Sequence, residues 1–182
     1  IQIFGGPAWK GSGWDRAPTY EEMKALSYLA VVHGAKGLFF FTISDSNYAS
    51  EGRQRDDLKR LLQELRFLGP WYLGEKAGAV DFSPDPLYEY APDGTRPVHA
   101  VMLGHGKHSI LIAVNVLDKE VKGRLSIPVD GLRYLDEFFS GKRYVVKYGN
   151  ITDEFRPYEV KVYLSGRTFR KISIRERKGD AV

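Results

Sequence analysis

The sequence predicts an α/β segment over residues 1–77, followed by an all-β domain over residues 78–182. In the first part, strand-like apolar runs alternate with helical patterns, which is typical of a parallel sheet. From Gly78 the helical periodicity stops, and short β-rich runs separated by turn residues follow. Many short strands at this spacing favour an antiparallel sandwich or barrel.

The first strand and helix of the α/β segment have clear sequence signals. Residues 1–4 are apolar and are stopped by a Gly-Gly-Pro sequence, which indicates the end of a strand. Thr19, with Glu22 three residues later, forms a capping box, so we expect a helix over residues 20–33. Gly34 then provides a left-handed helix end.

The second strand and helix indicate that this segment belongs to a larger sheet. Residues 38–43 are apolar on both faces, as expected for a strand covered on both sides. A leucine stripe predicts a helix over residues 56–68, and we expect Gly69 and Pro70 to end it. Two strands cannot cover two helices and themselves, so we expect this α/β segment to be incomplete.

Seven β-rich runs in the second part predict an antiparallel β-sandwich. They cover residues 98–103, 109–116, 123–129, 134–138, 142–147, 158–164 and 169–175. Alternating side chains in several of these runs are typical of half-buried strands. About one hundred residues are enough for an independent sandwich core.

Composition excludes several classes of function. The chain has no cysteine, which excludes a disulfide scaffold, a zinc-thiolate site and a cysteine nucleophile. We expect no metal and no cofactor. The net charge of +4 is only mildly basic, and the densest basic run, residues 167–178, is interpreted as a solvated strand and tail. No apolar run is long enough to span a bilayer. Residues 1–4 carry no signal-peptide pattern, so localisation stays open.

Three segments resemble the C-terminal part of (β/α)8-barrel glycoside hydrolases that carry an appended β-sandwich. Residues 14–22 read Trp-Asp-Arg-Ala-Pro-Thr-Tyr-Glu-Glu, and residues 34–41 read Gly-Ala-Lys-Gly-Leu-Phe-Phe-Phe. Residues 153–163 contain Phe-Arg-Pro-Tyr-Glu-Val-Lys-Val-Tyr. In such enzymes similar motifs occur, in this order, at the end of the barrel and in the last sandwich strands.

The resemblance implies positions within a TIM barrel. Residues 1–4 would be its seventh strand and residues 38–43 its eighth, each followed by its helix. The loops that face the active site would then be residues 5–16 and 44–51. The remaining barrel would be a partner, on the same or another chain.

The catalytic residues of such an enzyme are not identified in this chain. Glycoside hydrolysis usually needs two carboxylates, and the resemblance implies a nucleophile after the seventh strand. Gly5 and Gly6 stand there instead. Asp45 directly follows the eighth strand, which makes it the candidate catalytic carboxylate. The alternative interpretation of Asp45 is a turn cap, because Ser and Asn surround it.

Substrate-binding candidates lie in the glycine-rich loop before the first helix. Trp9 and Trp14 are large apolar side chains without an obvious core, and indole rings can stack on sugar rings. Alternatively, one of them packs under the loop. Arg16 could hold a sugar hydroxyl or carboxylate, or it could tie the loop to the next helix.

The sequence therefore predicts a fragment of a carbohydrate-active enzyme that cleaves glycosidic bonds. The chain would supply part of a sugar-binding cleft and an accessory sandwich, and on its own we expect it to be inactive. The alternative is a non-catalytic carbohydrate-binding module, with the β domain as the binder. Nucleic-acid binding is disfavoured, because no strand carries a clustered basic and aromatic motif.

Overall fold

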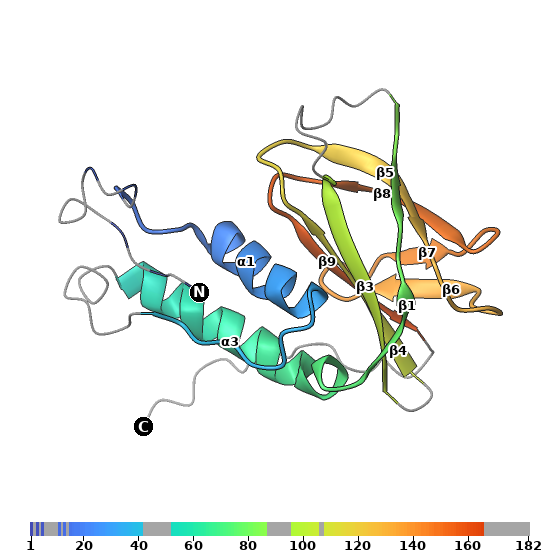
Figure 1. Ribbon diagram of the computed structural model, residues 1–182, viewed down its shortest axis with the longest axis horizontal. Helices are drawn as coiled ribbons and strands as arrows, with labels where there is room; N and C mark the ends of the chain where they lie inside the picture. The colour runs from blue at the N-terminus through green and yellow to red at the C-terminus, as the bar shows by residue number, and fades with distance from the viewer. Residues whose placement is uncertain are drawn as a thin grey trace.

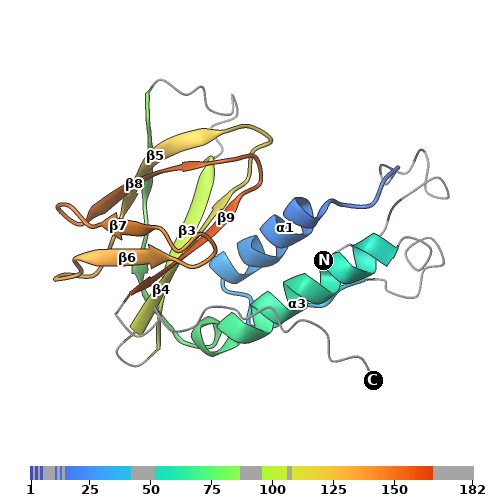
Figure 2. The same ribbon diagram turned by 180° about the vertical axis from the view of Figure 1, so that it is seen from behind.

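A computed structural model describes residues 1, 3, 5, 11, 13, 15–41, 52–86, 96–105 and 108–165. Within these ranges, two helices lie side by side against a β-rich part made of two antiparallel sheets (Figure 1). The view from behind shows the same arrangement, with both helices on one side of the strands (Figure 2). The chain therefore has a helical part and a larger antiparallel part, in the predicted order.

Helix α1 (Tyr20–Val32) corresponds to the helix predicted over residues 20–33, and both of its ends follow the sequence signals. The Glu22 N–H donates to Thr19 Oγ1 at 3.2 Å, and the Thr19 N–H donates to the Glu22 carboxylate at 2.8 Å. These two bonds are the predicted capping box. Gly34 has a φ of +97°, which confirms the left-handed helix end.

Helix α3 (Gly52–Tyr72) is longer than the helix predicted over residues 56–68, so the prediction that Gly69 and Pro70 end it was wrong. A proline interrupts a helix because it lacks an N–H and its ring crowds the preceding turn. Here the helix continues for only two residues beyond Pro70. Tyr72, at its end, is 8% exposed and belongs to the hydrophobic cluster of the helices. Packing of this last turn therefore outweighs the lost bond.

The β part consists of a six-stranded and a three-stranded sheet, and every pairing between their strands is antiparallel. This confirms the antiparallel, strand-rich character predicted for the second part. The larger sheet has the order β1 (Glu75–Ala79), β3 (Val98–His105), β4 (His108–Asn115), β9 (Val160–Ser165), β6 (Tyr134–Glu137) and β7 (Arg143–Val145). The smaller sheet has the order β2 (Phe82–Pro84), β5 (Val121–Ser126) and β8 (Asn150–Phe155).

Three of these strands are absent from the sequence prediction. β1 and β2 are short, and β1 has no alternating apolar side chains. β8 alternates between buried and exposed positions, but one of its inward residues is the polar Asp153, which hides the pattern. β1 also begins three residues before the predicted domain boundary at Gly78. The strand predicted over residues 169–175 lies outside the described residues.

Strand β4 is buried on both faces and joins two hydrophobic clusters. Ile110, Ile112 and Val114 belong to the cluster that contains the buried residues of α1 and α3. Leu111 and Ala113 belong to the cluster between the two sheets. Full burial of a large aliphatic side chain contributes about 1.5–3 kcal/mol. The helices are thus bound to the large sheet through one continuous apolar contact.

The described part of the phenylalanine-rich run after α1, residues 38–41, is packed on one face and exposed on the other, so the cover predicted on both faces of residues 38–43 stays a prediction. Its partner is the start of the chain: the Phe41 N–H donates to the Ile1 carbonyl, and the Phe41 carbonyl accepts from the Ile3 N–H, both at 2.9 Å. This is the bond pattern of neighbouring parallel strands. Phe40 packs against the helix cluster, whereas Phe39 is 77% exposed. No described element packs on the Phe39 face.

Candidate functional site

A cleft of about 770 Å³ lies between α1, the residues that precede it and the six-stranded sheet. One wall is the apolar face of α1, with Ala25, Leu26 and Leu29. The facing wall comes from the end of β4 and from the turn before β9. Its lining residues are Gly13, Asp15, Arg16, Pro18, Glu22, Ala25, Leu26, Leu29, Val114, Val116 and Tyr158. The cleft therefore combines an apolar interior with a charged rim.

Arg16, a predicted substrate-binding residue, lies on this rim and is bound to the helix that follows. Its Nη1 and Nη2 atoms each donate to the Glu22 carboxylate at 2.6 Å, and Nη1 also donates to the Ala17 carbonyl at 3.1 Å. The hydrogen bonds from Arg16 hold the pKa of Glu22 below its ordinary value, and the same contact raises the pKa of Arg16. The interpretation that Arg16 ties the loop to the helix thus describes a real contact.

Arg16 still has capacity for a ligand. A guanidinium carries five donor hydrogens, and the three bonds to Glu22 and Ala17 use three of them. Its side chain is 66% exposed, so the remaining donors are accessible. The ion pair fixes the guanidinium beside the cleft and leaves its remaining N–H donors available to a ligand.

Asp15 has a local structural partner. Its carboxylate accepts from the Gly11 N–H at 2.9 Å, which closes the turn that precedes the helix. The ion pair of its neighbour Arg16 is formed with Glu22 and not with Asp15. Trp9, Trp14 and Asp45, the other predicted site residues, lie outside the described residues.

Tyr158 is a cleft residue that was not among the predicted site residues. It follows Pro157 in the segment whose sequence resembles the last strands of accessory sandwiches, and its φ of +55° places it in the left-handed region. Its N–H donates to the Leu117 carbonyl at 3.0 Å. A left-handed backbone is unfavourable for a bulky side chain, and such strain often occurs at binding sites. Only the fold brings Tyr158 beside Leu26 and Arg16.

A buried ion pair fixes α1, the helix that lines the cleft, to α3. Lys24 Nζ lies 2.9 Å from a carboxylate oxygen of Glu64, and the Tyr20 hydroxyl donates to the other oxygen at 2.6 Å. Lys24 Nζ also lies 3.4 Å from the ring centroid of Phe139, in the turn after β6. Burial lowers the pKa of Lys24. One ammonium group therefore connects α1, α3 and the large sheet.

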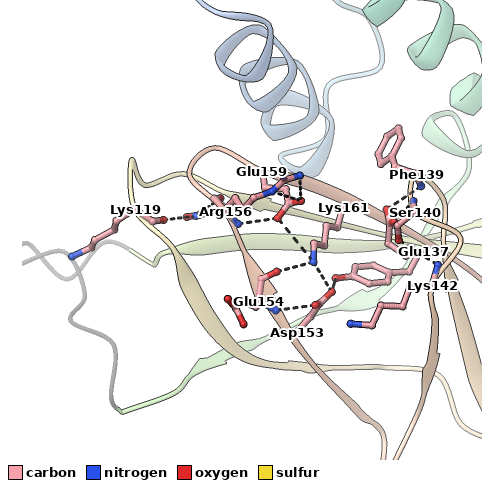
Figure 3. A network of polar contacts seen from close by, with 12 residues as sticks. Lys119, Glu137, Phe139, Ser140, Lys142, Asp153, Glu154, Arg156, Glu159 and Lys161 are labelled. Carbon is pink, nitrogen blue, oxygen red and sulfur yellow. Dashed lines mark hydrogen bonds and ion pairs between the residues drawn. The ribbon is translucent and has the colours of Figure 1, made fainter.

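Among the described residues of the β part, the acidic side chains of Glu137 and Asp153 are buried, and both form several polar contacts (Figure 3). Glu137 accepts from the Phe139 and Ser140 N–H groups at 3.1 and 2.6 Å, and from the Ser140 hydroxyl. Asp153 accepts from the Tyr163 hydroxyl at 2.7 Å and pairs with Lys161 Nζ at 3.0 Å. Burial raises the pKa of Asp153, but hydrogen bonds from Tyr144 and Tyr163 outweigh it, so its pKa is lowered.

The Glu137 and Asp153 carboxylates therefore hold the fold through these contacts, and neither of them lines the cleft near Arg16. Among the described residues, no group of three His, Cys, Asp or Glu side chains is placed to hold a metal ion. The described part of the cleft is suited to binding, with hydrogen-bond donors at its rim and an apolar, partly aromatic wall.

Within the described ranges, neither helix is long and apolar enough to cross a membrane.

Several glycoside hydrolases of known structure are similar in fold to this chain. An α-amylase from Geobacillus thermoleovorans, complexed with acarbose, matches 92% of this chain with a TM-score of 0.58 and 13% identity. A GH27 β-L-arabinopyranosidase from Geobacillus stearothermophilus matches 94% with a TM-score of 0.57 and 10% identity. An α-amylase from Anoxybacillus matches 91% with a TM-score of 0.55 and 15% identity. No protein-family model and no curated protein matches the sequence.

The chain spans little more than a third of these enzymes. It covers 38% of the first, 37% of the second and 37% of the third. At such low identity the likeness establishes the fold alone. The chain therefore has the fold of a part of carbohydrate-active enzymes.

Proposed function

We propose that this chain is the C-terminal part of a glycoside hydrolase. In this proposal, residues 1–77 are the seventh and eighth β/α units of a TIM barrel, and residues 78–182 form the accessory β-sandwich. The observation that carries the proposal is the similarity of nearly the whole chain, helical part and β part together, to enzymes of this class. A likeness confined to the sheets would support an isolated binding module equally well.

The parallel contact at the start of the chain supports the barrel assignment. The bonds of Phe41 to Ile1 and Ile3 have the geometry expected between adjacent barrel strands. The exposed Phe39 would face the barrel interior, which is normally filled by large side chains. A phenylalanine exposed to this extent is unfavourable, so we expect another surface to cover it in the whole protein.

The chain would contribute to sugar binding at the loop face of the barrel. Trp9 and Trp14 would stack on sugar rings, and Arg16 would donate to hydroxyl groups through the hydrogens that Glu22 leaves available. Asp45 remains the candidate catalytic carboxylate by its position after the eighth strand. The rest of the catalytic machinery would come from the remaining barrel.

The proposal is tested by assaying two proteins on a panel of aryl glycosides. One is this chain, and the other is extended N-terminally by the rest of the proposed barrel. We expect turnover only by the extended protein, because the isolated chain lacks one carboxylate of the catalytic pair. Turnover by the isolated chain would show that the missing half is not needed. An extended, folded protein that is inactive on every glycoside would argue against the enzyme assignment.

A further inference from the structure

A second hollow, of about 530 Å³, lies at the edge of the β part, away from the helices. Its volume is within the range of about 300–1,000 Å³ that is typical of small-molecule sites. β5, β7, β8 and the turn between β7 and β8 all contribute to it. The lining residues are Arg124, Lys142, Arg143, Tyr144, Val145, Lys147, Tyr148, Asn150 and Thr152.

The charges of this hollow are all positive. Four cationic side chains line it, and none of the lining residues is acidic. Arg143 is neutralised by Asp136, with Nε–Oδ1 and Nη2–Oδ2 distances of 2.6 and 2.7 Å. Arg124 and Lys147 form no ion pair with the described residues, and Lys142 Nζ lies 4.5 Å from the Tyr144 ring centroid. Unbalanced cations that converge on one hollow make a site for an anionic group.

The turn at the rim of the hollow presents an aromatic ring at a conformational cost. Tyr148 and Gly149 have φ values of +51° and +73°, and Lys147 and Asn150 exchange two backbone hydrogen bonds at 2.9 Å. Two-residue turns of this kind favour Asn, Asp or Gly at both central positions. Tyr148 is nevertheless fully exposed, so its side chain adds nothing to the core.

The conformation of Tyr148 is held by its neighbour across the turn. The Asn150 side-chain amide donates to the Tyr148 carbonyl at 2.6 Å, and its oxygen accepts from the Ser126 hydroxyl at 3.1 Å. The ring is thus presented next to the cations by a fixed backbone. Folding gives no reason for an aromatic residue at this position, whereas ligand stacking does.

We propose that this hollow binds an acidic saccharide, with Arg124, Lys142 and Lys147 paired to its carboxylate groups and the Tyr148 ring against a sugar face. Charged side chains recognise carboxylates through short charge-assisted hydrogen bonds. The Thr152 hydroxyl supplies a further polar group for sugar hydroxyls. The choice of a saccharide over another polyanion rests on the proposed function. The cations surround one hollow and do not form the stripe that follows a phosphate backbone.

The experiment measures binding of the full chain to oligogalacturonate by calorimetry. Malto-oligosaccharides of equal length serve as the neutral comparison, and a single-stranded oligonucleotide serves as the other polyanion. We expect binding of oligogalacturonate only, weakening as salt screens the exposed charges. Arg124→Gln and Lys147→Gln should each weaken it roughly fivefold, and together roughly 25-fold if their effects add.

Tyr148→Gly separates binding from folding. Glycine suits the left-handed turn, so the melting temperature should stay the same or rise. Affinity for oligogalacturonate should fall roughly tenfold with loss of the ring. Lys59→Gln is the matched control, because it removes one exposed positive charge from α3. Every variant keeps the basic run 167–178, so any contribution of that run is the same in all.

Three results would overturn the proposal. Unchanged affinity in the Arg124, Lys147 and Tyr148 variants would place the binding elsewhere. Equal affinity for the neutral oligosaccharide would show that the cationic side chains do not contribute to binding. Tighter binding of the oligonucleotide, lost in the same variants, would make the hollow a nucleic-acid site. None of these readouts depends on turnover, so they are independent of whether the extended protein hydrolyses glycosides.

Discussion

Glu22 has two structural roles at the entrance of the cleft. Its carboxylate accepts from the Thr19 N–H, which begins α1, and from both terminal nitrogens of Arg16. The first role was predictable, because the capping box is a local pattern of residues three positions apart. The second was left open, because Arg16 had two equally reasonable interpretations. The structure shows the tie to the helix, while the sugar contact of Arg16 stays a prediction.

Substitutions at Glu22 separate these two roles. Glu22→Ala removes the ion pair and the bond from the Thr19 N–H, which is one half of the capping box, and should lower the free energy of unfolding by about 1 kcal/mol. Glu22→Gln keeps a capping acceptor and should lose less, about 0.5 kcal/mol, because exposed ion pairs contribute little. Urea unfolding measures both. Equal losses in the two variants would contradict the separation, and Arg16→Ala is the control that removes the ion pair, together with the Ala17 contact, and keeps the capping box.

The same contact predicts a pH dependence. The folded-state pKa of Glu22 is below its ordinary value of 4.5, so the unfolded chain binds the proton more readily. Its contribution to stability is therefore present at neutral pH and is lost as the pH falls below 4.5. We expect the stability of Glu22→Gln to fall less between pH 6 and pH 3 than that of the parent chain. Parallel pH curves would show that Glu22 is not shifted.

At the scale of elements, local signals specified both ends of α1, and tertiary contacts decided that α3 extends past Pro70. The cap at Thr19 and the left-handed Gly34 needed no tertiary information. The continuation of α3 past Pro70 did need tertiary information, because the last turn of α3 is held by burial of Tyr72. β8 went unpredicted because Asp153 faces inward, and its partners Tyr163 and Lys161 lie on another strand. An inward-facing polar residue can be recognised only when the residues that pair with it are known.

The attachment of the helices to the sheet depends on Lys24, which connects α1, α3 and the turn after β6. Lys24→Met keeps the apolar stem but removes the ammonium at 2.9 Å from the buried Glu64 carboxylate, which then keeps only the Tyr20 hydroxyl and the more distant Arg60 Nε at 3.8 Å. We expect a loss of about 3 kcal/mol in the free energy of unfolding. Adding Glu64→Gln should restore part of this loss, because the neutral amide is cheaper to bury and can still accept from Tyr20. Failure of the second substitution to rescue the first would contradict an electrostatic role.

At the scale of the whole molecule, the two candidate sites differ in how far the sequence could predict them. The loop that carries Arg16 was a predicted part of the substrate site, because its residues are contiguous, whereas the wall from β4 and Tyr158 was not predicted. The cationic hollow was not predicted either, because Arg124 and Thr152 pair across β5 and β8 while Lys142 and Lys147 flank β7. No single strand carries the motif, and the charges converge only through sheet topology. For that reason a basic and aromatic site could not be predicted from the sequence.

The central claim is that this chain completes a larger barrel, and Phe39 tests it most directly. The measurement is the loss of unfolding free energy caused by Phe39→Ser, in this chain and in the protein extended by the rest of the barrel. In this chain Phe39 is 77% exposed, so we expect a change within about 0.5 kcal/mol. In the extended protein the ring would be buried, and we expect a loss of about 3 kcal/mol or more. A change near zero in both proteins would contradict the barrel.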